Sequence, residues 1–503
     1  MWVSWFIYLK IKQQVHRHTY ISVAEDIDIK RKTARTLKWN SIDRFSSQIL
    51  YAITGIILAN VLPKEDFGLV GAILVFQAFA TIFVDSGFGS ALLQKKSPDD
   101  RDYSTVFWFN LMVSVGLYII LFAAAPLLAD IFKDNRLIPL SRVMFLSFII
   151  NGLGIVQTNL LMKAMTVRRL ALSNITALIV SGIAGIWLAT TGYGAWALVW
   201  QTIVLAIIRT GWLWLASRWH PLLCFSIASL KSIFRVGMGV FSTSFLNTVF
   251  LNIYPFIIGA WYSLVALGDY TQADKWSKMG SASLSQIFMA TFVPLLSRYQ
   301  DNNEQYVRTM KQLNRLSASL AFPFMGGLAV MAPAIFHTLF GTKWDSAIIL
   351  FQLLVVRGAF TVLCSLYNNY LLSLGYARSL VIVEVVKDIA TVAAIAATVW
   401  LHSVDWLVMG QLISGIITWV AVLMITRRAT GYSYGLLTSG MVRYLLISLT
   451  AMAAAWSVGN LHLSPILILC IQACVGLIIY GGVLAIMRDP VLNEARNYLM
   501  HKQ

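Results

Sequence analysis

Long apolar stretches separated by short polar connections fill almost the whole chain. Fourteen such stretches lie at residues 40–62, 67–93, 104–128, 139–162, 171–190, 194–216, 233–260, 270–296, 316–340, 346–373, 379–402, 405–426, 442–458 and 464–487. A helix needs about 20 apolar residues to cross the hydrocarbon core of a bilayer. The pattern predicts an all-α integral membrane protein with about fourteen transmembrane helices.

Basic residues alternate along these connections. The two ends of the chain and every second connection carry 29 of the 39 lysines and arginines, whereas the remaining connections and the adjoining span ends carry six. Lysine and arginine concentrate in cytoplasmic loops. We therefore expect both termini in the cytoplasm, with residues 1–38 and 488–503 as cytoplasmic tails. The longest connection, 297–315, is polar and cytoplasmic, and we expect a short surface helix there.

Composition agrees with the membrane assignment and excludes several functions. Hydrophobic residues make up 58% of the chain and charged residues 12%, so the net charge of +17 mostly reflects topology. It also attracts anionic membrane lipids. A nucleic-acid partner is excluded because no basic soluble domain is present. The sequence carries no phosphate-binding loop, zinc motif or convincing catalytic triad, so we expect no enzyme activity, no metal and no cofactor.

An internal repeat describes how the spans are organised. A shift of 203 residues superposes Asp66 on Asp269, Phe67 on Tyr270 and Tyr51 on Tyr254. Two six-helix units with the same order and orientation imply a pseudo-twofold axis along the membrane normal, which is transporter architecture. We predict an N-terminal lobe at 39–217, a C-terminal lobe at 218–428, and two accessory helices within 429–487.

Polar side chains follow one face of the first predicted span at steps of three and four: Arg44, Ser47, Gln48, Tyr51, Thr54 and Gly55. Its repeat partner, the seventh span, carries Asn247 on a similar stripe, and Tyr254 precedes Pro255. We interpret these residues as the lining of a substrate cavity, because polar stripes in a membrane face protein or water. The alternative is that they hold helices together by hydrogen bonds.

Arg357 lies midway through the tenth predicted span, and Asn368 follows on the same face. A charge at that depth costs several kcal/mol unless it faces a partner or an aqueous cavity. Arg357 and Asn368 are therefore candidate substrate-binding residues. A structural ion pair is the competing interpretation for Arg357.

Three acidic residues within the predicted spans are candidates for ion coupling: Asp85, Glu384 and Asp388. Glu384, Lys387 and Asp388 follow one another at helical steps and can neutralise each other locally, which favours a structural cluster. Asp85 precedes two glycines and suits a hinge or cap equally well. A proton or sodium gradient is the candidate energy source, and the sequence specifies neither.

Six motifs run in order along the chain: LPKEDFGL (62–69), DSGFGSALLQKK (85–96), GYGAWALV (192–199), LGDYTQA (267–273), FVPLLSRYQDN (292–302) and LFGTKWDSAIILFQLL (339–354). In these motifs the chain resembles the polysaccharide exporters of the MOP (multidrug/oligosaccharidyl-lipid/polysaccharide) superfamily. Within that superfamily it is most similar to the colanic acid exporter branch of lipid-linked oligosaccharide flippases.

The resemblance implies a MATE-like fold, with two six-helix lobes around a central cavity and two further helices. It also implies export of an isoprenoid-diphosphate-linked oligosaccharide by alternating access across the bacterial cytoplasmic (inner) membrane. Other polysaccharide assembly proteins are expected partners. The chain departs from the expected pattern at Tyr254, where an acid is expected before the proline, and this weakens cation coupling through the seventh span.

Other functions make different demands on the sequence. A MATE-type cation-coupled drug antiporter shares the implied fold, but it needs essential acids within the membrane. A polysaccharide polymerase or ligase needs a sizeable outer loop, and the longest outer connection has about ten residues. A scaffold that transports nothing leaves the polar stripes unexplained. Export of a lipid-linked oligosaccharide is the function that the sequence favours.

Overall fold

The structure is a computed structural model that describes residues 36, 38–85, 88–95, 98–461 and 463–491. Every regular element in those residues is helical. The chain folds as two compact units, and the first comprises the chain through Val61 together with Ile73–Val249. The second comprises Leu62–Ala72 and the chain from Phe250 onward. Helix α2 (Lys64–Asp85) begins in the second unit and ends in the first.

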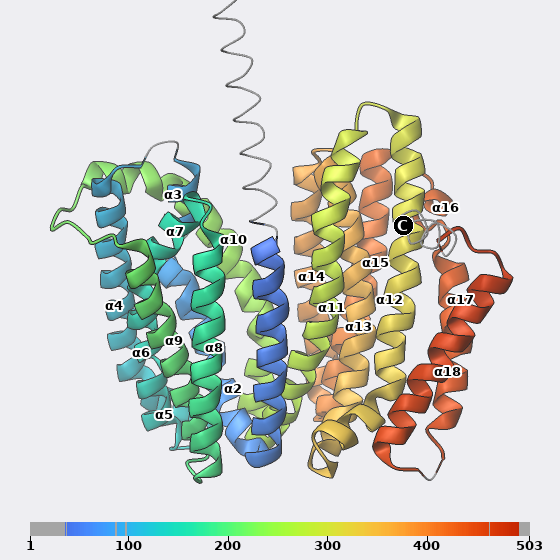
Figure 1. Ribbon diagram of the computed structural model, residues 1–503, viewed down its shortest axis with the longest axis horizontal. Coiled ribbons are helices and arrows are strands. Elements are labelled where there is room, and N and C mark those ends of the chain that lie inside the picture. Colours follow the sequence, from blue (N-terminus) through green and yellow to red (C-terminus); the bar gives the residue numbers. More distant parts are fainter. Residues whose placement is uncertain (1–35, 37, 86–87, 96–97, 462, 492–503) are drawn as a thin grey trace, which may run out of the picture. The chain divides into compact units, whose positions relative to one another are not determined.

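The first unit opens with a helix over residues 38–61. Its further helices, coloured blue to green in Figure 1, are the C-terminal part of α2, α3 (Phe88–Gln94), α4 (Asp100–Phe132), α5 (Leu137–Met144), α6 (Leu146–Gly152), α7 (Ile155–Lys163), α8 (Val167–Thr190), α9 (Ala195–Ser217) and α10 (Ile227–Ile257) through Val249. Helix α9 packs against α5, α6, α7 and α8, so it is the central helix of this unit.

The second unit begins with the N-terminal part of α2 and takes up the end of α10, which leads into a π-helix (Ile258–Tyr262). Its other elements are α11 (Leu264–Arg298), α12 (Asn303–Leu339), a 3₁₀ turn (Thr342–Trp344), α13 (Asp345–Ser373), α14 (Ala377–Thr398), a 3₁₀ turn (Val399–Leu401), α15 (Val404–Thr430), α16 (Tyr434–Leu437), α17 (Met441–Val458) and α18 (Pro465–Ile486). Helix α13 is central here, because it packs against α11, α12 and α15.

Twelve helical stretches of the described chain are long and apolar enough to cross a membrane, and they match twelve of the predicted spans. The other two predicted spans, 40–62 and 379–402, are also helical, as residues 38–61 and α14, but they are not among the twelve. Helix α14 differs because Glu384, Lys387 and Asp388 lie near its middle, so no 18-residue stretch of it avoids these three charges. The all-α membrane class is confirmed, and the count of fourteen stays a prediction.

Two predicted elements differ from the structure. The span at 139–162 is not one helix but three short ones, α5, α6 and α7, which Phe145 and the Leu153–Gly154 pair separate. The expected surface helix within 297–315 is wrong, because residues from Asn303 onward form the first turns of the 37-residue helix α12. Asn302 caps that helix by accepting a hydrogen bond from the backbone amide of Gln305 at 3.1 Å.

The accessory helices α17 and α18 pack on α12 and on each other within the second unit (Figure 1). Tyr444 of α17 donates a hydrogen bond to the buried carboxylate of Asp489 at 2.8 Å, and Arg443 pairs with the same carboxylate at 3.1 Å. The predicted boundaries of lobes and accessory helices follow the internal repeat rather than packing, and they stay a prediction.

Helices α2 and α11 cross at two glycines within the second unit. A Cβ atom on Gly68 would lie 1.8 Å from the carbonyl oxygen of Leu264, and a Cβ atom on Gly268 would lie 2.2 Å from that of Lys64. No side chain fits at either distance, so glycine allows the two backbones to touch. This contact brings together two segments that the internal repeat superposes.

Candidate functional site

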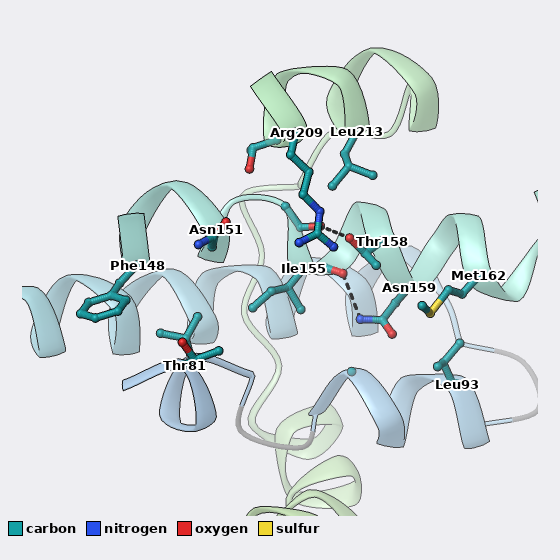
Figure 2. A pocket seen from close by; sticks show the side chains of 14 residues that line it. Thr81, Leu93, Phe148, Asn151, Ile155, Thr158, Asn159, Met162, Arg209 and Leu213 are labelled. Carbon is teal, nitrogen blue, oxygen red and sulfur yellow. Dashed lines mark hydrogen bonds between the residues drawn. The ribbon is translucent and has the colours of Figure 1, made fainter. Parts of the chain in front are cut away.

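A cavity of about 430 Å³ lies inside the first unit, between α2, α3, α6, α7 and α9. Arg209 of α9 reaches into it, and Figure 2 shows its guanidinium beside Thr158 of α7. Asn151 and Asn159 contribute amides to the wall. The rest of the wall is mostly apolar: Val84, Leu93, Phe148, Ile155, Met162 and Leu213.

Most polar side chains of this wall already have partners in their own helices or next to them. The hydroxyl of Thr158 donates to the carbonyl of Gly154 at 2.9 Å, and the amide of Asn159 donates to that of Ile155 at 2.9 Å (Figure 2). Thr210 donates to the carbonyl of Ile150 at 3.0 Å. These bonds satisfy three polar side chains locally, and Arg209 is the charged donor among the described lining residues.

Arg209 differs from these neighbours. Its Nε atom is buried and has no hydrogen-bond partner among the described residues. The described residues that line the cavity include no aspartate or glutamate. A half-buried arginine with no carboxylate among the described lining residues is suited to an anionic ligand, because its planar guanidinium matches the oxygens of a phosphate or carboxylate.

A second polar cluster surrounds Arg357 inside the second unit. Its guanidinium lies within electrostatic reach of the phenols of Tyr254 on α10 and Tyr270 on α11. Tyr270 donates a hydrogen bond to Gln411 of α15 at 3.4 Å. Asp274, which is in electrostatic range of Tyr270, pairs with Lys278 at 2.6 Å rather than with Arg357.

Arg357 therefore has no carboxylate within ion-pair distance in the part of the chain that the structure describes. The stem of Arg357 packs near Gly415 of α15, where an added Cβ would lie 3.1 Å from its Cγ. The structural ion pair considered for Arg357 is not present among these residues. Its substrate role stays a prediction.

A third group of charges lies where α2 crosses α11. Lys64 pairs with Asp269 at 2.8 Å, and the hydroxyl of Ser346 accepts from Lys64 at 2.5 Å and donates to Asp269 at 2.7 Å. Trp344 lies under the ammonium groups of Lys64 and Lys343 at 5.7 and 5.6 Å from its ring centre. Within this Lys64–Asp269–Ser346 cluster Asp269 is 5% exposed and Lys64 is half-buried, whereas Ser346 is exposed.

The predicted cavity residues of the first span occupy the helix at 38–61. Arg44 is exposed and Gln48 is half-buried. Tyr51 is 44% exposed and lies within electrostatic reach of Arg209. Asn247 is exposed on α10. The structure thus brings one predicted residue, Tyr51, near the cavity arginine.

The remaining predicted residues are spread over α2, α10, α13 and α14. Tyr254 is buried at 2% exposure, and its hydroxyl has no partner among the described residues. The side-chain oxygen of Asn368 is also buried without a partner in that part of the chain. Asp85 ends α2, and its side chain lies outside the described residues.

Of the three neighbouring charged residues on α14, Glu384, Lys387 and Asp388, two form an ion pair. Glu384 forms an ion pair with Lys387 one turn away. Asp388 is not part of this pair, and its Oδ1 is buried without a hydrogen-bond donor among the described residues. The expected mutual neutralisation is therefore seen for two of the three residues.

Arg209 is the functional candidate that the sequence pattern missed. It lies near the predicted inner end of its span, so the charge pattern assigns it to the basic connection at 209–235. In the structure it belongs to α9, eight residues before the helix ends at Ser217. A rise of 1.5 Å per residue places it about 12 Å from that end. The distance of Arg209 from the end of its span was the one signal in the sequence that could have identified it as a candidate.

The family model described as polysaccharide biosynthesis protein matches residues 57–349. The teichuronic acid biosynthesis protein TuaB of Bacillus subtilis is 24% identical over 351 residues, which cover 68% of this chain and 71% of that protein. The succinoglycan biosynthesis transport protein ExoT of Rhizobium meliloti is 24% identical over 366 residues, 73% of this chain and 74% of that protein. The lipopolysaccharide biosynthesis protein WzxC of Escherichia coli is 24% identical over 338 residues, 66% of this chain and 68% of that protein.

Solved structures share the fold. The inward closed conformation of the lipid II flippase MurJ matches with a TM-score of 0.74 at 15% identity, over 90% of this chain and 99% of that one. An inward-facing MATE family transporter of the MOP superfamily matches with a TM-score of 0.60 at 14% identity, over 78% of this chain and 98% of that one. The predicted MATE-like fold is confirmed. Because the family model covers more than half of the chain, the protein belongs to the family of polysaccharide biosynthesis proteins.

Proposed function

We propose that the protein exports an isoprenoid-diphosphate-linked oligosaccharide across the bacterial inner membrane, as a carrier rather than an enzyme. Membership of the polysaccharide biosynthesis family supports this proposal, as does the relative named a succinoglycan biosynthesis transport protein. A lipid-linked sugar precursor requires such a carrier, because its diphosphate cannot cross hydrocarbon unaided. Both termini are cytoplasmic in this proposal.

The observation that carries the proposal is the unpaired Arg357 midway along α13. A charge at that depth requires a counter-ion, and the described residues offer no carboxylate within ion-pair distance. The diphosphate of the substrate is a suitable counter-ion, since a guanidinium binds phosphate oxygens with two parallel hydrogen bonds. Tyr254 and Tyr270 lie within electrostatic reach of the same guanidinium.

The transport cycle proposed here is alternating access. Arg357 and Arg44 attract the diphosphate, polar side chains such as Gln48, Asn247 and Asn368 contact the sugars, and the isoprenoid tail stays in the bilayer. Tyr51 has an exposed face that can stack on a sugar ring, whereas Tyr254 is buried in this conformation. A proton or sodium gradient drives the cycle through Asp85, Glu384 or Asp388.

The test replaces Arg357 in the native host and measures surface polysaccharide against the amount of protein in the membrane. Arg357→Ala should abolish export at a normal protein level, whereas Arg357→Lys keeps the charge, loses the two-pronged geometry and retains partial activity. Arg142→Ala is the matched control, because Arg142 lies over the ring of Phe122 at 4.3 Å. Full export by Arg357→Ala would contradict the proposal, and full dependence on Glu384 with none on Arg357 would favour a drug antiporter.

A further inference from the structure

The residues that line the cavity belong to the first unit, whereas Arg357 and the residues described with it belong to the second. The cavity volume of about 430 Å³ holds far more than one water molecule, since a water occupies about 30 Å³ of liquid. Figure 2 shows Arg209 entering it from α9 with its guanidinium beside Thr158, and Asn151 and Asn159 elsewhere on the same wall. The cavity is therefore large enough for a charged group together with part of a chain.

The charge of this wall is positive. Arg209 has five donors, its Nε is buried without a partner among the described residues, and the lining residues that the structure describes include no acid. The hydroxyls of Thr158 and Thr210 and the amide of Asn159 are already bonded to backbone carbonyls. Arg209 is thus the group that a ligand must satisfy, and its planar fork matches phosphate oxygens.

The remainder of the wall selects what is attached to the anion. Apolar side chains from α2, α3, α6, α7 and α9 line it, and they exclude a fully hydrated ion such as free phosphate. An anion joined to a hydrocarbon chain satisfies both halves of the wall, because the chain is buried against the apolar side chains while the phosphate meets Arg209. Tyr51 lies within electrostatic reach of Arg209, so its side chain is near the position proposed for the phosphate.

We propose that this cavity binds the phosphate or diphosphate group of a lipid through Arg209, as a second anion site in addition to Arg357. Two lipids carry that chemistry, the isoprenoid diphosphate of the substrate and an anionic phospholipid of the bilayer. The first source rests on the proposed export function, and the second is independent of it. In either case the site lies within one unit and does not require the other.

The test uses the full-length protein purified in dodecyl maltoside and titrated with farnesyl diphosphate, dihexanoyl phosphatidylglycerol, farnesol or inorganic pyrophosphate. Tryptophan fluorescence reports binding. Arg209→Gln should weaken binding of at least one of the two lipid anions by about tenfold or more, as expected for the loss of a charged hydrogen bond. Farnesol and pyrophosphate should bind weakly to every variant, since each lacks half of the ligand.

Two matched variants separate this site from other arginines. Arg218→Gln, just beyond the end of α9, should bind both lipid anions as the parent does. In the Arg357→Gln background, which lacks the other proposed anion site, Arg209→Gln should still weaken the remaining lipid-anion binding, so failure of this inference and failure of the proposed function are distinguishable. Unchanged affinity in Arg209→Gln, or a loss confined to Arg357→Gln, would overturn the second site.

The two lipids distinguish the source of the anion. If Arg209→Gln selectively loses farnesyl diphosphate binding, the cavity is assigned to the substrate. If it selectively loses phosphatidylglycerol binding, the cavity is assigned to a bilayer lipid. If Arg209→Gln does not fold, Ile155→Trp provides a second variant that fills the cavity and keeps the charge of Arg209. It should weaken binding of the same lipid anion. Asp85→Asn tests whether the carboxylate of Asp85, rather than a lipid anion, neutralises Arg209. The proposal would be contradicted if Asp85→Asn bound the lipid anions more tightly while Arg209→Gln bound them as the parent does.

Discussion

The Lys64–Asp269 pair offers the sharpest test of what stabilises the second unit. At a separation of 2.8 Å, two unit charges attract by about 6 kcal/mol when the effective dielectric constant is about 20. Only 17% of the Lys64 side chain and 7% of the Asp269 side chain are exposed, so solvent screens the pair weakly. The gross attraction is opposed by the desolvation of both groups, and the net contribution of the pair is much smaller.

Removing one partner is costly because it leaves the other charge buried. We expect Asp269→Leu to lower the free energy of unfolding by about 3–5 kcal/mol, since the ammonium group of Lys64 then lacks its carboxylate. Lys64→Met should cost less, because the hydroxyl of Ser346 still donates to Asp269 at 2.7 Å. The double variant should recover most of the loss, since an apolar pair of similar volume is often as stable as a buried ion pair.

Equilibrium unfolding of the purified protein by sodium dodecyl sulfate in dodecyl maltoside micelles, followed by circular dichroism, measures the four free energies of this cycle. The control is Asp134→Asn, because Arg136 pairs with Asp134 at 2.7 Å but is 54% exposed. Hydrogen bonds from Arg136 lower the pKa of the Asp134 carboxyl, and the loss there should still be below about 1 kcal/mol. A double variant no more stable than Asp269→Leu, with a coupling energy below about 0.5 kcal/mol, would refute the reasoning.

Gly68→Ala should destabilise the protein by about 1–3 kcal/mol in the same assay, because its Cβ would overlap a carbonyl oxygen, whereas Gly116→Ala, with nothing within 4 Å, should be neutral or stabilising. Glu384→Gln should lower thermal stability and leave gradient-dependent transport in reconstituted vesicles intact, since Glu384 pairs with Lys387; a stable but uncoupled variant would contradict this. In a background without native cysteines, single cysteines within 129–137 and 261–268 should react with a membrane-impermeant maleimide in intact cells, whereas those within 297–315 should not; labelling of 297–315 would reverse the topology.

Hydropathy predicted the positions of the spans because a bilayer requires a minimum apolar length, and this requirement acts on each helix separately. The same measure does not detect a break such as Leu153–Gly154, since the residues around it remain apolar. Hydropathy also did not reveal that the polar residues from Asn303 onward are the first turns of α12, because a helix can continue past the membrane surface with charged residues. Length and composition thus locate the spans, and local backbone chemistry determines where the helices begin and end.

The candidate sites divide in the same way. Arg357 was predictable because a charge midway along a span has few structural explanations. Arg209 was not, because depth near a helix end does not reveal whether a side chain turns to the interface or into a cavity. The Lys64–Asp269 pair joins residues 205 positions apart, and the repeat superposed their segments without revealing that they touch. Side-chain direction and long-range contact required the structure.

The ion pair where α2 crosses α11 makes the two halves of the chain non-interchangeable. The repeat superposes Asp66 on Asp269, but Lys64 superposes on Leu267, so only the first half supplies a cation. A chimera with the first-half segment at both positions would place two lysines beside two aspartates. The converse chimera would bury two aspartates, Asp66 at 6% and Asp269 at 5% exposure in the present chain, with no lysine from either copy. An ancestor made of two identical halves was therefore compatible with this crossing only if its half resembled the present N-terminal one.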